Sequence, residues 1–260
     1  MIDAATSAAG FGVGVVVGLT GIGGGALMTP LLVLVFGVAP HTAVGTDLVF
    51  ACITKLFGVF AHGRRGTVDW LVVRRLAAGS LPAALLAMLW LALAESSQRR
   101  AGVIMPVLGA ALLLTAGGLL LRRHLHEVGK RLRTVSPAQF KRVQPALTVV
   151  AGFVVGALVA LTSVGAGALG TVALVYLYPY RLSPAKLVGT DLAHAIPLTL
   201  IAGAGHLALG NIEFGLLGSL LLGSIPGILL GSMFSARAPE AIVRYAMAIV
   251  LVVVAVRLLW

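Results

Sequence analysis

The chain has 260 residues, of which 59% are hydrophobic and only 10% are charged. Soluble domains carry about 25% charged residues, so this composition excludes an ordinary soluble protein and indicates helices that cross a membrane several times. A net charge of +11 would suggest nucleic acid in a soluble chain, but here the basic residues lie between apolar segments, where they orient a protein in the bilayer. We therefore expect the lipid bilayer as a partner and no nucleic acid.

Apolar segments follow one another along the whole chain, and several reach the roughly 20 residues that a membrane-spanning helix needs. They cover residues 8–36, 42–62, 71–93, 100–121, 145–178, 184–206, 213–233 and 240–259. The stretch 122–144 is polar and basic, which indicates an amphipathic or flexible cytoplasmic connector. We predict an all-α, polytopic transmembrane bundle with a first repeat at 1–121, this connector, and a second repeat at 145–260.

The two halves repeat each other. Gly45–Leu48 recurs as Gly189–Leu192, 144 positions later, and the same offset relates Gly79–Pro82 to Gly223–Pro226. Transporters are often built from two such halves, and their binding sites lie where the halves meet. The repeat therefore predicts a transporter whose working residues occur in matched pairs.

The first segment of each half contains a break rich in small residues. Residues 8–36 are interrupted at Gly21–Gly25, and residues 145–178 at Ser163–Gly167, an offset of 142. Each segment is either one long helix packed closely through its glycines or a re-entrant hairpin of two half-helices. The positive-inside rule favours the hairpin, because fewer basic residues then lie outside. Single crossings place Arg99, Arg100, Arg181, Lys186, Arg237 and Arg244 outside, whereas hairpins leave only Arg99, Arg100 and Arg257 there.

With two hairpins, each half crosses the membrane three times, so the halves would be inverted relative to one another. The loop around residues 63–75 contains four arginines, whereas its partner around 207–219 contains none. Positions on opposite sides of the membrane explain this contrast, and parallel repeats do not. We therefore predict inverted repeats, with parallel repeats as the alternative.

The glycines at the breaks are suited to an anion. If the helices stop there, the following half-helices begin with partial positive charge and their amide N–H groups are free to bind. Glycine carries no Cβ that would keep a ligand away from the backbone. We predict a small anionic substrate at these positions, and tight helix packing without a ligand is the alternative. The predicted binding glycines are Gly23, Gly24, Gly25, Gly165 and Gly167.

Two acidic residues, Asp47 and Asp191, occupy matched positions inside apolar segments. Ionisable groups at membrane depth are functional candidates because their desolvation is costly. We predict that these carboxylates couple transport to protons, the alternative being a cap or a dipole partner near a helix start. The preceding residues, Thr46 and Thr190, would donate hydroxyl hydrogen bonds to the anion.

Lys55 lies deeper in its apolar segment, on the helix face that Asp47 begins. It would neutralise the anion directly or act as counter-ion to an intramembrane aspartate, and a purely structural ion pair is a third interpretation. His62 and His206 lie at matched helix ends, where interfacial hydrogen bonding is expected rather than metal binding. A single cysteine, Cys52, offers no Cys-rich site, so we expect no metal and no cofactor.

Four motifs, in this order and with duplicated second-half forms, resemble the sulfite exporter TauE/SafE family, also called the TSUP transporters. They are Gly21–Pro30, Ala43–Leu48, His62–Trp70 and Gly79–Pro82, and the resemblance covers nearly the whole chain. It implies a membrane carrier for small anions, commonly sulfur oxyanions or organosulfonates such as sulfite, sulfoacetate or thiosulfate, working as an exporter or an importer. Asp47 and Lys55 depart from the pattern of many relatives, and the second break is a degenerate form of the first.

We therefore predict a secondary transporter in the cytoplasmic (inner) membrane of a prokaryote, moving a small sulfur-containing anion with proton coupling through the two aspartates. A passive anion channel is one alternative. Another is an intramembrane hydrolase that uses Ser80 or Ser224 with His62 or His206, although catalysis rarely needs two symmetric copies of each residue. The chain would act as a monomer or as a homodimer.

Overall fold

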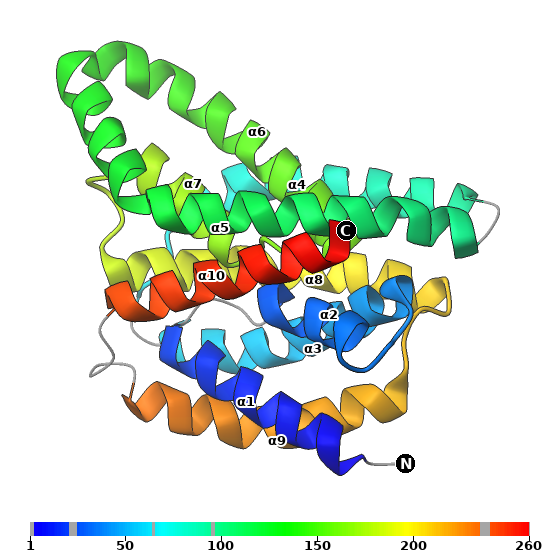
Figure 1. Cartoon of the computed structure of the whole chain (residues 1–260). Coiled ribbons are helices and arrows are strands. Elements are labelled where there is room, and N and C mark those ends of the chain that lie inside the picture. The colour runs from blue at the N-terminus through cyan, green and yellow to red at the C-terminus, as the bar shows by residue number, and fades with distance from the viewer. Residues whose placement is uncertain (1–2, 21–24, 64–65, 95–96, 235–239, 260) are drawn as a thin grey trace.

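The computed structural model describes residues 3–20, 25–63, 66–94, 97–234 and 240–259, and every element in these ranges is a helix (Figure 1). Five described helices are long and apolar enough to cross a membrane, namely α4, the part of α5 from Gly102, α6, α8 and α9. The all-α, polytopic prediction is therefore confirmed. The elements are α1 (Ala4–Thr20), α2 (Gly25–Leu34), α3 (Pro40–Gly63), α4 (Trp70–Leu93), α5 (Ser97–Val135), α6 (Pro137–Thr162), α7 (Ala168–Leu177), α8 (Pro184–Ala208), α9 (Phe214–Phe234) and α10 (Glu240–Leu259).

The first apolar segment of each half is divided into two helices, as the glycine-rich breaks predicted. In the second half, α6 ends at Thr162, and Ser163 and Gly165 adopt positive φ angles of 60° and 111° before α7 begins. A φ of 111° is open to glycine but not to L side chains, so Gly165 allows the chain to reverse. The chain then returns along α6, because the hydroxyls of Thr148 and Tyr178 lie 2.9 Å apart. The second segment is therefore a hairpin rather than one long helix.

In the first half, α1 ends at Thr20 and α2 begins at Gly25. Val13 of α1 packs with Met28 and Leu32 of α2 in one buried cluster, so α2 lies back against α1. Gly23 and Gly24, two of the predicted anion-binding residues, lie outside the described residues.

The basic connector is helical. Residues 122–135 form the end of α5, which is 39 residues long, and residues 137–144 form the start of α6, with Ser136 between the two helices. The turn from α5 to α6 projects from one end of the molecule (Figure 1). The sequence left open an amphipathic or a flexible connector. The segment is an ordered pair of helix ends rather than a flexible linker.

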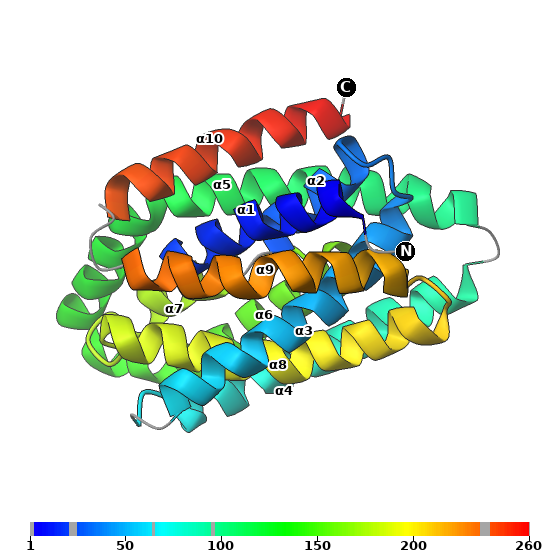
Figure 2. The same ribbon diagram turned by 90° about the horizontal axis from the view of Figure 1, so that it is seen from below.

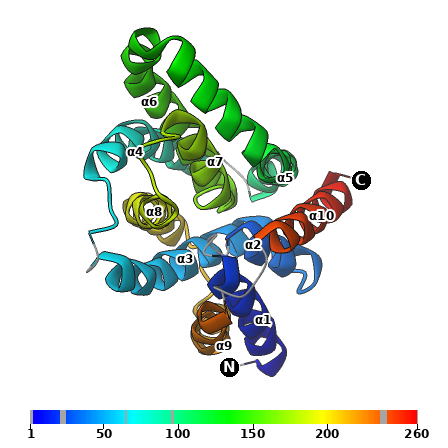
Figure 3. The same cartoon turned by 90° about the vertical axis from the view of Figure 1, so that its left-hand side faces the viewer.

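Helices of different halves interlock through glycines. α1 lies along α9 (Figures 2 and 3), and α6 lies along α4 (Figure 3). A Cβ built on Gly79 of α4 would lie 1.9 Å from the carbonyl oxygen of Val149 in α6, and one on Gly223 of α9 would lie 1.8 Å from that of Ser7 in α1. These are the matched glycines of the repeated motif. They allow backbone-to-backbone contact between the first helix of one half and a later helix of the other.

The equivalent helices α3 and α8 pack against each other in the centre, between the α1–α9 and α4–α6 pairs (Figure 3). Gly45, near the start of α3, faces the carbonyl of Asn211, which follows the end of α8. Gly189, near the start of α8, faces the carbonyl of Thr67, which follows the end of α3. The two helices therefore run antiparallel.

Replacing Gly79 with alanine should destabilise the protein, because the added methyl group would force α4 and α6 apart. Overpacking of this kind costs about 1–3 kcal/mol. Gly117→Ala is the matched control, since outside α5 itself the described residues place no atom within 4 Å of that position. In thermal unfolding in detergent we expect a lower midpoint for Gly79→Ala and an unchanged or slightly higher one for Gly117→Ala. Equal midpoints would contradict the close contact.

Candidate functional site

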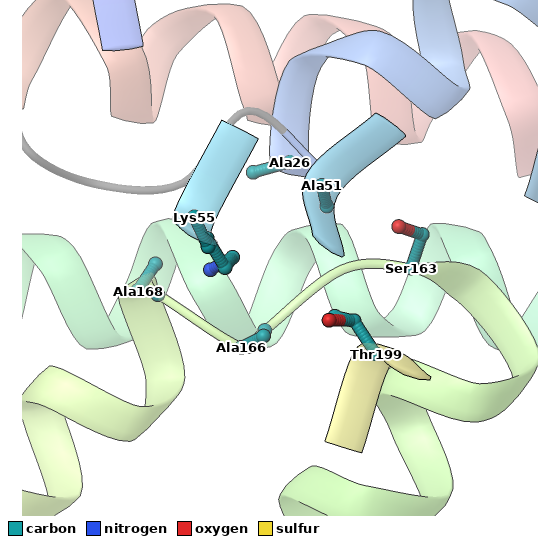
Figure 4. Close-up of a pocket in the computed structure, with 9 residues that line it drawn as sticks. Ala26, Ala51, Lys55, Ser163, Ala166, Ala168 and Thr199 are labelled. Atoms are coloured by element: carbon teal, nitrogen blue, oxygen red, sulfur yellow. The ribbon is translucent and has the colours of Figure 1, made fainter. Parts of the chain in front are cut away.

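A small cavity lies where the two halves meet (Figure 4). It has a volume of about 10 Å³, which is close to the minimum that holds one water molecule. Two pairs of repeat-equivalent residues contribute to it, Ala26 with Ala168 and Lys55 with Thr199. The cavity therefore lies on the interface that the repeat predicted. Its other lining residues are Ala51, Ser163, Gly165, Ala166 and Gly167.

Two short helices begin at this cavity. Gly167 caps the start of α7 and Ala168 is its first residue, while α2 begins at Gly25, beside the lining residue Ala26. The first amides of a helix have no acceptor within it, and the helix dipole adds partial positive charge there. Of the predicted glycines, the structure thus brings Gly165 and Gly167 to the cavity wall and Gly25 next to it.

Lys55 places a basic side chain at the cavity. Its side chain is 4% exposed, and its ammonium nitrogen has no hydrogen-bond partner among the described residues. Figure 4 shows this nitrogen pointing into the space between Ala166 and Ala168. Asp47 and Asp191 both attract Lys55 electrostatically, but neither belongs to the cavity wall. The ammonium group is therefore available to a ligand.

The two aspartates face the half-helices that follow the breaks. The hydroxyl of Thr29 in α2 donates a hydrogen bond of 2.6 Å to Asp47 Oδ2. Asp191 faces α7, where a Cβ on Gly170 would lie 2.5 Å from Asp191 Oδ1. Both carboxylates are buried, and each Oδ1 has no hydrogen-bond partner among the described residues. Asp191 lies well inside α8, whose N-cap is Ser183, so it is not a helix cap.

The structure adds a buried pair that the sequence did not predict. Ser80 Oγ of α4 and His194 Nε2 of α8 are 2.8 Å apart, and both residues are buried. His194 Nδ1 has no partner in the described part of the chain, so no carboxylate orients the ring as in a catalytic triad. His206, the expected partner of a serine, instead bonds the Ala160 carbonyl and the Asn211 side chain. The only sign of this pair in the sequence was that His194 lies beside the helix face that carries Asp191.

Comparison with known proteins identifies the family of the chain. Residues 6–258 match the family described as Sulfite exporter TauE/SafE. The chain belongs to this family. It is 42% identical over 255 residues, 96% of this chain and 97% of the relative, to the probable membrane transporter protein YjnA of Bacillus subtilis (strain 168). A second B. subtilis relative, the probable membrane transporter protein YdhB, is 26% identical over 240 residues, 91% of each chain. No solved structure matches the chain significantly.

In this TauE/SafE protein the repeated threonines join the halves rather than line the cavity. The Thr190 hydroxyl accepts a hydrogen bond of 3.0 Å from the backbone N–H of Asp69, and the Thr46 hydroxyl accepts one of 3.1 Å from that of Glu213. Each threonine thus holds the loop that follows the equivalent helix of the other half. Neither residue is among those that line the cavity, although both were predicted to bind the anion.

One of these two contacts is reinforced by an ion pair. The Arg181 guanidinium donates two hydrogen bonds to the Asp69 carboxylate, of 2.6 and 3.0 Å. These bonds hold the pKa of Asp69 below its ordinary value. Asp69 also caps α4, because its side chain accepts from the backbone N–H of Val72. This loop of the first half is therefore fixed to the second half by both backbone and side chain.

Thr190→Val should lower the stability of the protein by about 1 kcal/mol or more, because the Asp69 N–H loses its acceptor while the side-chain shape is kept. Thr190→Ser retains the hydroxyl and is the control. The measurement is thermal unfolding in detergent. We expect Thr190→Val to unfold at a lower temperature than Thr190→Ser and the unmodified protein. Equal midpoints in the two variants would contradict the role of this hydrogen bond.

Proposed function

We propose that this TauE/SafE protein is a secondary transporter that carries small sulfur oxyanions or organosulfonates through a site between its two halves. The observation that carries the proposal is the Lys55 ammonium group, buried without a partner among the described residues at the cavity where α7 begins. A buried amino group without a hydrogen-bond partner is costly, and an anion bound beside it lowers that cost. The sulfite named in the family's description supports the substrate class.

The donors around the cavity suit a group with several oxygens. They are the Lys55 amino group, the buried hydroxyl of Ser163, which also faces the Asp47 carboxylate, and the first amides of α7. None of the described lining residues is acidic. A sulfite or sulfonate group presents three oxygens that accept hydrogen bonds. This set of donors favours an oxyanion over a cation or a neutral ligand.

The closed state of the cavity favours a carrier over a channel. Lys55, Ser163 and Thr199 are all buried, and the volume of about 10 Å³ is too small for a four-atom anion such as sulfite. Binding therefore requires the wall from α2 and α3 to move relative to the wall from α7 and α8. A site that must open is expected of alternating access between two halves.

The aspartates are placed to couple this movement to protons. Asp47 holds α2 through Thr29, and Asp191 lies against α7 at Gly170, so the charge of each carboxylate acts on a helix that begins at the cavity. Gain or loss of a proton changes how strongly the carboxylate attracts the positive start of that helix. His194, one turn after Asp191, lies in the same region and is hydrogen-bonded to Ser80.

We also infer that the halves are inverted in the membrane, with the basic end in the cytoplasm. The antiparallel packing of α3 and α8 supports this, because it puts the loops that follow these equivalent helices at opposite ends. Contacts bring Arg75 to Tyr178 and Arg181 to Asp69, and a hollow joins Arg122, Arg123 and Arg244 to the same α7–α8 region. Arginines gathered at one end indicate the cytoplasmic side.

Lys55→Ala should reduce the flux of labelled sulfite or sulfoacetate into proteoliposomes by about tenfold or more, because a charge-assisted hydrogen bond to the anion is lost. Lys186→Ala is the matched control, since Lys186 is exposed near the start of α8. Its flux should equal that of the unmodified protein.

Asp47→Asn extends the same experiment, since the amide still accepts from Thr29 but cannot ionise. Its flux should no longer respond to a pH gradient.

Unchanged flux in Lys55→Ala, with thermal stability also unchanged, would remove the proposed role of the lysine.

A labelling experiment tests the inversion. Cys52, which is the single natural cysteine and is buried, is first replaced with alanine. Val68→Cys and Ile212→Cys then mark equivalent loops, and Ser136→Cys marks the turn between α5 and α6. A membrane-impermeant maleimide should label Ile212→Cys in intact cells, and the other two only after permeabilisation. Labelling of Val68→Cys and Ile212→Cys from the same side would contradict inverted halves.

A further inference from the structure

A second hollow, separate from the central cavity, lies at the arginine-rich end of the molecule. It has a volume of about 560 Å³ and is enclosed by the end of α5, the end of α7, the start of α8 and α10. Arg122 and Arg123 line it from α5 and Arg244 lines it from α10, while Val175 and Leu187 supply apolar wall. Three arginines therefore line the hollow, from two helices that belong to different halves.

Arg244 is the unusual member of this group. Its side chain is only 6% exposed, and its Nε is buried without a hydrogen-bond partner among the described residues. The guanidinium lies over the Tyr245 ring, 5.3 Å from the ring centre. A buried guanidinium nitrogen without a partner is costly unless an acceptor such as an anion meets it.

The remaining polar groups of the hollow leave its net charge positive. Glu127 is the one acidic residue among the described lining residues, and its carboxylate is 3.0 Å from the ammonium group of Lys130. His126 Nδ1 is 3.3 Å from the carbonyl of Val175. The hollow therefore has a net positive charge. Its arginines carry planar guanidinium groups, whose paired N–H donors match the oxygens of a phosphate.

We propose that this hollow binds the phosphate group of an anionic phospholipid. Apolar surface continues from it on both helices. On α5, Leu120 lies three residues before Arg123 and is 46% exposed. On α10, Tyr245, whose ring Arg244 covers, is 50% exposed, and Ile249, one turn further along the helix, is 64% exposed. Acyl chains would cover these strips while the phosphate reaches the arginines. Basic hollows between helices at the cytoplasmic side are suited to the anionic lipids of that leaflet.

Such a lipid would join the two halves at their periphery. The phosphate would bridge α5 of the first half and α10 of the second, beside the loop from α7 to α8 that carries Arg181. The site does not depend on the proposed anion transport, because none of its residues lines the central cavity. Loss of the lipid should therefore change stability without removing the substrate site.

The test uses the full chain in detergent, with thermal unfolding and native mass spectrometry as measurements. The probes are dioleoyl phosphatidylglycerol, dioleoyl phosphatidylcholine, whose choline compensates the phosphate, and inorganic phosphate. We expect phosphatidylglycerol to raise the unfolding midpoint and remain bound, and the other two to have little effect. Arg244→Gln should weaken phosphatidylglycerol binding about fivefold or more. Arg244→Lys, which keeps the charge without the fork, should weaken it less.

Arg142→Gln is the matched control, because Arg142 is exposed on α6 and is not among the residues of the hollow. It should bind phosphatidylglycerol like the unmodified protein. If Arg244→Gln does not fold, Arg123→Gln carries the test, since Arg123 is exposed. Equal binding in these variants and the control would overturn the proposal. An equal, Arg244-dependent effect of inorganic phosphate would retain the phosphate site and assign it to a soluble ligand.

Discussion

Backbone groups that a helix break leaves free cannot face lipid, so protein must enclose them. In this chain the described break, Ser163–Gly167, lies beside α3 and α8 in the interior of the molecule. The enclosure depends on helices of one half lying against helices of the other, which glycines such as Gly79 and Gly223 permit by removing the Cβ from the contact. The broken helices, the central cavity and the interlocked halves are thus one arrangement, and none of them is stable in lipid without the others.

The two halves differ at the wall of the central cavity. The aspartates and threonines are repeated, but Lys55 of the first half corresponds to Thr199 of the second, and both line the cavity. Two lysines there would place like charges close together in a space of about 10 Å³ shielded from water, where their repulsion is strong. One cation with one hydroxyl residue suits a single anion on the interface. His194, whose counterpart is Phe50, is another group present in one half alone.

The sequence predicted the all-helical fold, the divided first segments and the position of Lys55, Gly165 and Gly167 near one another, because apolar length, glycine clusters and the repeat are local signals. The pairing of α1 with α9 and of α6 with α4 is not local, and no spacing in the sequence specifies it. The roles of Thr46 and Thr190 depend on that pairing, since each bonds a loop of the other half. For the same reason the Ser80–His194 bond, between α4 and α8, could not be predicted.

The two ends of the α3–α8 pair are closed with unequal strength. Both have a threonine hydrogen bond, but Asp69 adds its ion pair with Arg181, whereas Glu213 at the matched position makes no ion pair with the described residues. The Arg181 side chain is 50% exposed, so solvent screens the pair and its contribution is about 1 kcal/mol or less. An energy of that size changes a two-state population by about fivefold. It favours closure at the arginine-rich end without locking that end shut, which is compatible with the alternating access proposed above.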